Sequence, residues 1–177
     1  MLVVVCGPPC TGKSTIGAEL QRRLGFTHLE VDAIRQRVLP DSDQRPEDRD
    51  IAYRAMHLLA EHLLRTGKMV AVNATYNRER QREELASILK SIQCPAVLVQ
   101  CKAPLEIVIT RFKARPSGHP ALDLTEALVR ELWSNFAYSD DGIVVDTSRA
   151  PELSLADVQA HVRGSRPDSL ERWVRMQ

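Results

Sequence analysis

Residues 3–15 of this 177-residue chain read VVVCGPPCTGKST, and this stretch decides the fold. The run Val3–Cys6 is short, apolar and β-branched, which predicts a buried strand. Residues from Lys13 to Leu24 have the apolar spacing of a helix, and Gly25 is placed to end it. A strand, a glycine-rich turn and a helix in direct succession predict the first unit of a parallel α/β fold.

The turn between this strand and helix has the spacing Gly-x4-Gly-Lys-Ser of a phosphate-binding loop. Its glycines allow the backbone N–H groups to point inward and, with the positive end of the helix, to form a cradle for a β-phosphate. Lys13 is placed to reach the β- and γ-phosphates, and Ser14 to ligate Mg²⁺. We therefore predict a site for ATP or GTP with Mg²⁺. The residues expected to bind the nucleotide are Gly7, Pro8, Pro9, Cys10, Thr11, Gly12, Lys13, Ser14 and Thr15.

Length and charge limit the classes of protein that fit. A chain of 177 residues suits one compact domain, residues 1–177, and its formal net charge of +1 excludes the strong basic field of a dedicated duplex-DNA binder. Local arginine clusters would have to carry any contact with nucleic acid.

The cysteines and the N-terminal residues indicate the compartment. Cys6, Cys10, Cys94 and Cys101 lack the spacing of a zinc site and are expected to be reduced. Cys10 lies near a helix N-terminus, where the pKa of a thiol can fall, which would make it sensitive to oxidation or alkylation. The opening run, residues 1–5, is too short for a signal sequence, and no stretch has the apolar length of a membrane span. We expect a cytoplasmic protein with no membrane contact.

Strand and helix patterns alternate along the whole chain, which predicts a P-loop NTPase fold of the kinase type, with a five-stranded parallel sheet flanked by helices. The expected strands are Leu2–Cys6, Thr27–Val31, Met69–Asn73, Ala96–Cys101 and Ile143–Asp146. The expected helices are Lys13–Leu24, Ala33–Val38, Pro46–Thr66, Arg78–Ser91, Pro104–Lys113, Leu124–Phe136, Ser154–Gly164 and a terminal helix after Asp168.

Short polar residues suggest how several helices begin. Asn77 and Ser154 are read as N-caps, Asp123 with Glu126 as a capping box, and Asp168 as the cap of the terminal helix. On the terminal helix, Trp173 is expected in the core.

Ligands of open parallel sheets bind at the carboxyl ends of the strands, so the residues that follow each strand are candidates. Asp32 follows the second expected strand, and Arg35 lies one helical turn later. The carboxylate could accept the proton of an attacking hydroxyl, and the arginine could hold an anionic group of the acceptor. The alternative is that Asp32 only caps the next helix. Strand alternation places Glu30 one pair of residues further back, which makes it a weaker candidate for the base.

The third strand leads into polar residues. Asn73 and Thr75 could orient the acceptor or a water bound to Mg²⁺. Three arginines follow at positions 78, 80 and 82, alternating with glutamates, a pattern typical of a solvated helix face with ion pairs.

Arg111 and Arg115 lie four residues apart, before the sequence PSGHP at residues 116–120, which is too broken for a helix. We read residues 111–123 as a lid that brings positive charge over the γ-phosphate and excludes water. The alternative is an exposed arginine pair stabilised by the helix dipole. Arg149, after the last strand, is a further candidate for contact with the nucleotide.

With these residues, the whole chain resembles the small P-loop kinases of the zeta-toxin and AAA_33-like group, and most closely the 5′-hydroxyl polynucleotide kinase domain. The resemblance rests on the loop GPPCTGKST, on the segment VDAIR at 31–35, and on NATYNRER at 73–80. It implies that Asp32 is the general base and that Arg35 holds a phosphate of the acceptor strand. It further implies that Lys13, Ser14, Arg111 and Arg115 serve ATP, Mg²⁺ and the transition state.

The chain departs from this pattern at Asn73, where related kinases usually carry aspartate. Chloramphenicol phosphotransferases and other small-molecule kinases share the same loop and the same acid after the second strand. The function expected is therefore a kinase acting on a nucleic-acid 5′-hydroxyl or a nucleotide-like acceptor. The alternatives are a kinase for a small metabolite or antibiotic, and an ATPase switch that works through a protein partner.

Overall fold

A five-stranded parallel sheet forms the centre of the computed structural model, which describes residues 1–42, 45–115, 124–164 and 168–176. The strands are β1 (Leu2–Cys6), β2 (Thr27–Glu30), β3 (Val70–Asn73), β4 (Ala96–Lys102) and β5 (Ile143–Asp146). Their order across the sheet is β2-β3-β1-β4-β5, and every pair is parallel. The predicted fold class is confirmed.

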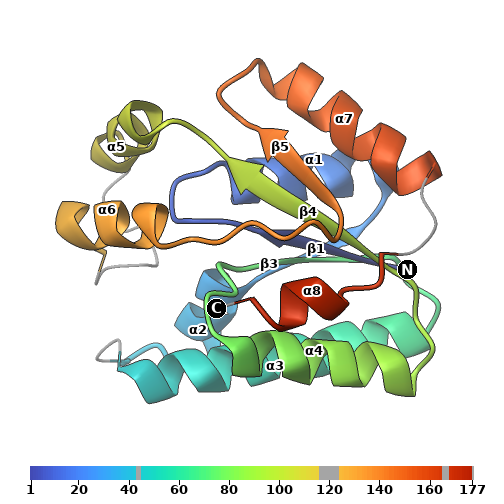
Figure 1. Cartoon of the computed structure of the whole chain (residues 1–177). Coiled ribbons are helices and arrows are strands. Elements are labelled where there is room, and N and C mark those ends of the chain that lie inside the picture. Colours follow the sequence, from blue (N-terminus) through green and yellow to red (C-terminus); the bar gives the residue numbers. More distant parts are fainter. Residues whose placement is uncertain (43–44, 116–123, 165–167, 177) are drawn as a thin grey trace.

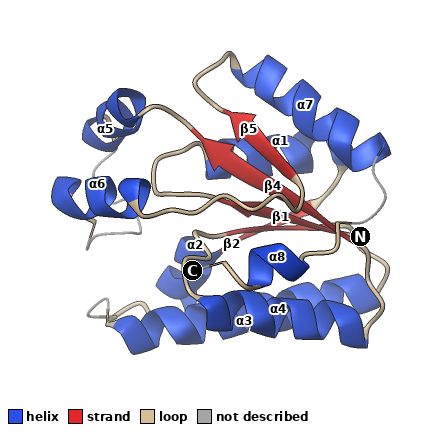
Figure 2. Ribbon diagram, viewed as in Figure 1, coloured by secondary structure: helices blue, strands red, loops and turns tan. Residues whose placement is uncertain are grey.

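Helices cover both faces of this sheet (Figures 1 and 2). They are α1 (Lys13–Leu24), α2 (Val31–Val38), α3 (Pro46–Arg65), α4 (Glu79–Ser91), α5 (Leu105–Lys113), α6 (Glu126–Ser134), α7 (Pro151–Gly164) and α8 (Glu171–Val174). In Figure 1, α1 and α7 lie on one side of the sheet, and α3, α4 and α8 lie on the other. The fold is thus a three-layer α/β/α arrangement.

Two apolar clusters hold the layers together. Alternate residues of β1 enter opposite clusters, because neighbouring side chains of a strand point to opposite faces. One cluster includes Leu2 and Met56, together with Trp173, which is fully buried as expected. The other includes Val3 and Leu20. Since β1 is buried along its whole length in the middle of the sheet, the loop that follows it starts from a rigid base.

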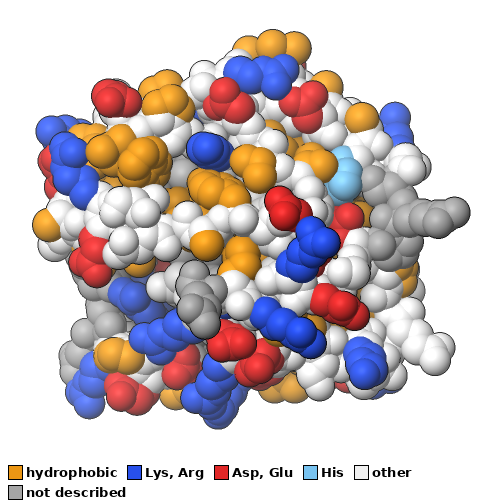
Figure 3. All heavy atoms as spheres, viewed as in Figure 1, with side chains coloured by type: hydrophobic (Ala, Val, Ile, Leu, Met, Phe, Trp, Pro, Cys, Tyr) orange, Lys and Arg blue, Asp and Glu red, His pale blue; other side chains and the backbone are white. Residues whose placement is uncertain are grey.

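A third, smaller cluster joins α5 to α6 through Val108 and Val129. These two helices lie beyond the carboxyl ends of the strands in Figure 1. Figure 3 shows apolar side chains gathered near α5, while acidic and basic side chains alternate over α3 and α4. None of the helices in the described part of the chain combines the length and apolar character needed to cross a bilayer.

One predicted helix end is confirmed, but several helices begin at other residues than the sequence predicted. Gly25 ends α1 with φ +73, as expected. The second helix begins at Val31, directly after β2, so Asp32 lies inside its first turn and is not its cap. Arg78, not Asn77, occupies the N-cap position of α4, and no side chain caps it.

Other polar residues expected to cap helices are used elsewhere. Helix α7 begins at Pro151, and Ser154 Oγ donates a hydrogen bond to the carbonyl oxygen of Asp146 at 2.8 Å. Asp168 accepts a hydrogen bond from the backbone N–H of Leu98 at 2.7 Å, and α8 starts only at Glu171. These side chains tie helices to the sheet instead of starting them.

The last corrected start is that of α6. Its N-cap is Thr125, whose Oγ1 accepts from the backbone N–H of Leu128 at 3.2 Å, so α6 is shorter than the predicted Leu124–Phe136. Asp123, the expected start of a capping box, lies outside the described residues.

Candidate active site

The phosphate loop follows β1 and is shaped largely by contacts within itself. Gly7 has φ +144, and a Cβ there would lie 2.5 Å from the carbonyl oxygen of Cys101. Thr11 Oγ1 donates a hydrogen bond to the carbonyl oxygen of Pro8 at 2.7 Å, and Gly12 begins α1 with φ +84. The backbone therefore takes a conformation that only glycine accepts at its first turn.

Lys13 projects from the start of α1, and its Nζ donates to the carbonyl oxygen of Pro8 at 2.8 Å. Burial lowers the pKa of this ammonium, because the charged form loses solvation in the loop. An anionic phosphate in the cradle would restore that lost stabilisation. Lys13 thus lies in the loop, with its ammonium on a carbonyl of that loop.

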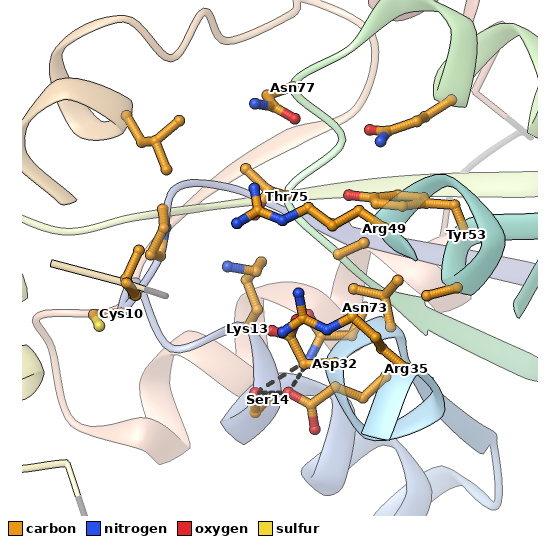
Figure 4. A pocket seen from close by; sticks show the side chains of 18 of the residues that line it. Cys10, Lys13, Ser14, Asp32, Arg35, Arg49, Tyr53, Asn73, Thr75 and Asn77 are labelled. Atoms are coloured by element: carbon orange, nitrogen blue, oxygen red, sulfur yellow. Dashed lines mark hydrogen bonds and ion pairs between the residues drawn. The ribbon is translucent and has the colours of Figure 1, made fainter. Parts of the chain in front are cut away.

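Ser14 and Asn73 lie beside the loop (Figure 4), and with Glu30 they form a small polar cluster. Ser14 Oγ donates a short hydrogen bond to Glu30 Oε1. Asn73 Nδ2 lies 3.2 Å from Ser14 Oγ and 3.3 Å from Glu30 Oε1. The Ser14 hydroxyl and the Glu30 carboxylate are oxygen ligands suited to Mg²⁺ or to its bound waters, so these two residues fit this ion, while Asn73 directs its amide N–H groups toward them.

Sheet register explains why Glu30 belongs to this cluster. Glu30 is the last residue of β2 and pairs with Asn73, the last residue of β3. The sequence pattern predicted a strand that continued through Val31, which placed Glu30 too far back from the strand end. Glu30 is therefore a site residue that the sequence argument set aside.

Asp32 and Arg35 form an ion pair across one turn of α2, with 3.3 Å between Arg35 Nη2 and Asp32 Oδ1. The Arg35 side chain is only 4% exposed, whereas that of Asp32 is 38% exposed. Both line a cavity of about 310 Å³ that also contains Lys13 and Ser14. The structure thus brings the predicted acid and its arginine into the same cavity as the phosphate loop.

Two residues of α3 complete this wall and were not foreseen. Arg49 and Tyr53 are four residues apart on one helix face, and both line the cavity. Figure 4 shows Arg49 reaching from α3, and Arg35 from α2, over Asp32 and toward Lys13. The pKa of Arg49 is lowered, first by burial and then by the charge of Arg35. The helical spacing could have paired these two residues, but nothing in the sequence indicates which face of α3 meets the cavity.

The loop between β3 and α4 supplies Thr75 and Asn77, which line the cavity. Two hydrogen bonds at Tyr76 hold the backbone of this loop. The Tyr76 N–H donates to Tyr53 Oη at 3.0 Å. Arg82 Nη1 donates to the carbonyl oxygen of Tyr76 at 2.9 Å. Tyr76 itself has φ +56, an unusual value for a bulky residue.

Two of the three arginines after β3, Arg78 and Arg80, are exposed and ion-paired, as predicted, whereas Arg82 is buried. Arg78 and Arg80 pair with Asp50 of α3, not with the neighbouring glutamates. Arg82 is 3% exposed and also donates to the carbonyl oxygens of Val174 and Met176. It joins the C-terminal segment to the loop that carries Thr75.

The predicted lid arginines both line the cavity. Arg111, on α5, donates to the carbonyl oxygen of Thr147 at 2.5 Å and to its hydroxyl at 3.2 Å. Thr147 Oγ1 in turn donates to the carbonyl oxygen of Thr11 at 2.7 Å. Arg111 is therefore held against the phosphate loop through Thr147, a residue that the sequence analysis did not single out. The remainder of the predicted lid, residues 116–123, lies outside the described residues.

Only some of the other residues predicted to bind the nucleotide line the cavity. Pro9, Cys10 and Gly12 line the cavity. Arg149 pairs with Asp157 at 2.8 Å, away from the cavity lining. Thr15 is exposed on α1, outside the cavity. The remaining loop residues, Gly7, Pro8 and Thr11, are not part of the cavity lining, and the Pro8 carbonyl accepts hydrogen bonds from Thr11 and Lys13.

The expectation of a reactive Cys10 is wrong in direction. The thiol is half-buried, and burial raises its pKa more than Arg115 and Lys13 lower it. A thiol with a raised pKa is a poorer nucleophile at neutral pH.

Comparison with known proteins agrees with this arrangement. The sequence model of a family described as an AAA domain, AAA_33, matches residues 2–138. No curated protein sequence matches the chain.

Similar solved structures include several kinases. A sugar kinase from Janibacter sp. has a TM-score of 0.71 at 19% identity, with 99% of this chain and 98% of that chain covered. The Mycobacterium tuberculosis APS kinase, in complex with AMPPNP and APS, has a TM-score of 0.70 at 18% identity, with 92% and 97% covered. The tunicamycin resistance protein of Deinococcus radiodurans has a TM-score of 0.67 at 16% identity, with 93% and 96% covered. At these identities the likeness establishes a P-loop kinase-like fold.

Proposed function

Because the chain belongs to the AAA_33 family and has a P-loop kinase-like fold, we propose that it is an ATP-dependent kinase that phosphorylates a hydroxyl group. The acceptor is the 5′-hydroxyl of a nucleic acid or a nucleotide-like molecule. One observation carries the proposal: a single cavity holds Lys13 and Ser14 of the phosphate loop together with Asp32 and the buried Arg35.

On the donor side, the loop N–H groups and Lys13 would hold the β- and γ-phosphates of ATP. Arg111 and Arg115 face the same cavity and would stabilise the charge that spreads over the transferred group. Ser14 would ligate Mg²⁺, with Glu30 and Asn73 holding its bound waters. When bound, Mg²⁺ supplies positive charge between the β- and γ-phosphates.

On the acceptor side, Asp32 would accept the proton of the attacking hydroxyl. Its carboxylate is oriented by Arg35 at 3.3 Å. Because Asp32 is partly exposed while Arg35 is buried, the carboxylate can meet an acceptor that enters from outside. A water molecule is a poorer substrate for this arrangement, because it offers no group for the arginines to hold.

A small-molecule phosphotransferase is the second candidate. It is favoured by the size of the cavity, about 310 Å³, which is shared between the donor phosphates and the acceptor. A sugar kinase and an antibiotic resistance protein are among the similar folds. A site of this size would take a compact acceptor whole, or only the end of a longer one.

The test offers a 5′-hydroxyl oligonucleotide, a hexose or chloramphenicol as acceptor, together with [γ-³²P]ATP and Mg²⁺. It measures the label transferred to each acceptor and the label released as free phosphate. Lys13→Met and the exposed Lys68→Met serve as a matched pair. We expect label in the oligonucleotide for the wild type and for Lys68→Met, and a loss of at least roughly 10³-fold for Lys13→Met.

Label in the hexose or chloramphenicol alone would select the small-molecule kinase. Free phosphate as the sole product, formed quickly, would contradict the kinase proposal and favour an ATPase that acts through a partner.

A further inference from the structure

Gln81, on α4, has a buried amide that no interaction within the described part of the chain explains. The residue is 5% exposed, and its side chain lines the cavity that contains Asp32. Its Oε1 is shielded from solvent and has no hydrogen-bond partner among the described residues. Buried polar atoms are normally paired, because leaving one unpaired is costly. An orphan acceptor on a cavity wall therefore points to a ligand that supplies an N–H or O–H donor.

Charge on the same wall indicates a second property of that ligand. Arg35 and Arg49 line the cavity from α2 and α3, and Arg35 is buried. The pKa of Arg49 is lowered first by burial and then by the like charge of Arg35. Asp32 offsets part of this charge through its ion pair with Arg35. An anion between the two guanidinium groups would accept hydrogen bonds from both.

We propose that Gln81 determines acceptor specificity by accepting a hydrogen bond from an O–H or N–H group of the acceptor other than the hydroxyl that is phosphorylated. The phosphate that the family resemblance already implies at Arg35 would lie on the same cavity wall, which Arg49 also lines. This inference rests on the proposed kinase function and assigns a specificity-determining residue to the same site.

The position of Gln81 supports a role in recognition and not in the fold. The next residue, Arg82, holds the C-terminal segment through the carbonyl oxygens of Val174 and Met176. Gln81 makes no such link through its Oε1. Replacing it with methionine, which is similar in length and lacks the amide, removes the orphan oxygen without leaving a large cavity.

The experiment measures phosphorylation of adenosine 3′-monophosphate and of adenosine by the wild type, Gln81→Met and Arg49→Met. Gln36→Met, an exposed glutamine of α2, is the matched control. We expect Gln81→Met to raise the KM for adenosine 3′-monophosphate at least about tenfold, the factor that one lost hydrogen bond to a buried group produces. The KM for ATP stays within about twofold, because no donor-side contact is removed.

Two further readouts separate recognition from structure. The melting temperature of ligand-free Gln81→Met equals or exceeds that of the wild type, since an unpaired buried oxygen is removed. The wild type prefers adenosine 3′-monophosphate to adenosine in kcat/KM, and Arg49→Met loses most of that preference. An unchanged acceptor KM in Gln81→Met, or a melting temperature several degrees lower, would overturn the inference.

A binding measurement distinguishes failure of this inference from failure of the kinase proposal. If the wild type phosphorylates neither probe, calorimetry measures adenosine 3′-monophosphate binding to protein loaded with AMPPNP and Mg²⁺. Binding to the wild type that Gln81→Met weakens at least about tenfold would support the acceptor site while the kinase proposal fails. No binding to the wild type would overturn the site as well.

Discussion

The donor and acceptor sides of the cavity are built in different ways. The donor side comes mainly from one continuous stretch, residues 7–15, whose shape depends on its own glycines and on hydrogen bonds between residues a few positions apart. The acceptor side is assembled from α2, α3, α4 and the loop after β3, so its residues span positions 32–81. Its geometry depends on packing, such as the hydrogen bond from Tyr76 N–H to Tyr53 Oη. Local backbone chemistry therefore specifies the nucleotide end, while tertiary contacts specify the acceptor end.

The sharpest test of the donor side is Gly7→Ala, because the first turn of the phosphate loop depends on this glycine and lies against β4. The new Cβ would meet the carbonyl oxygen of Cys101 at 2.5 Å, at φ +144. We expect a stability loss of about 3 kcal/mol from strain and overlap together. Gly25→Ala, also at positive φ but with nothing within 4 Å of its Cβ, should lose only about 1 kcal/mol. Urea unfolding and AMPPNP calorimetry measure both variants; equal losses would show that the close approach at Gly7 is unimportant.

Arg35→Met tests the acceptor side in the same manner. Loss of a buried guanidinium should raise the KM for the acceptor roughly 10- to 100-fold, the usual worth of a charged hydrogen bond. The KM for ATP should change less than about threefold, because the phosphate loop is untouched. Arg37→Met, exposed on the same helix, is the control. A parallel rise in the KM for ATP would mean that the two sides of the cavity do not act separately.

Asn73 and Glu30 lie where the two sides meet, and they are tested through the Mg²⁺ requirement. Asn73→Asp adds a carboxylate beside Ser14 and should lower the Mg²⁺ concentration for half-maximal activity about tenfold. Glu30→Gln removes a carboxylate from Ser14 and should raise that concentration by about the same factor. Without Mg²⁺, Asn73→Asp should melt at a lower temperature, because its carboxylate would stand about 3.3 Å from that of Glu30. Titration of activity with Mg²⁺ checks both effects; an unchanged requirement in Glu30→Gln would remove Glu30 from the proposed magnesium site.

The smallest expected effect is a pH dependence of stability that comes from His57, which is buried beside Tyr76. His57 is fully buried, its Nε2 lies 3.2 Å from Tyr76 Oη, and burial lowers its pKa to about 4. In the unfolded chain His57 therefore takes up a proton near pH 6.5, whereas in the folded protein it does so only near pH 4. The contribution of neutral His57 to the free energy of unfolding is therefore fully present above pH 6.5. Stability falls by at most about 1.4 kcal/mol per pH unit from 6.5 down to 4.

Urea unfolding of the wild type, His57→Gln and the exposed His62→Gln at pH 7.5 and 5.5 measures this contribution. His57→Gln should lose less stability on acidification than the other two proteins. The same loss in all three would show that His57 does not carry the pH dependence.

The sequence predicted features that depend on nearby residues. All five strands, the phosphate loop and the conformation of Gly25 follow from short patterns, and the structure confirms them. Helix starts were less predictable, because Ser154 and Asp168 can cap a helix or bind the sheet, and only the fold decides between the two.

The acceptor side could be predicted only in part. Asp32 and Arg35 were found because they follow a strand end at helical spacing. Arg49 and Gln81 were missed because burial of one helix face depends on which element packs against it. The alternating charges after β3 predicted a solvated helix face, but the C-terminal segment supplies two carbonyl oxygens to Arg82 and buries it.

The most direct test of the account is a single-turnover experiment on Asp32→Asn, with Asp41→Asn of the following exposed loop as control. AMPPNP binding with Mg²⁺ is measured by calorimetry, and phosphate transfer to the acceptor by rapid quench. The account predicts that Asp32→Asn binds AMPPNP within about twofold of the wild type but transfers phosphate about 10²- to 10⁴-fold more slowly, the range for loss of a general base. Transfer at the wild-type rate, or a loss of AMPPNP affinity that matches the loss of transfer, would contradict it.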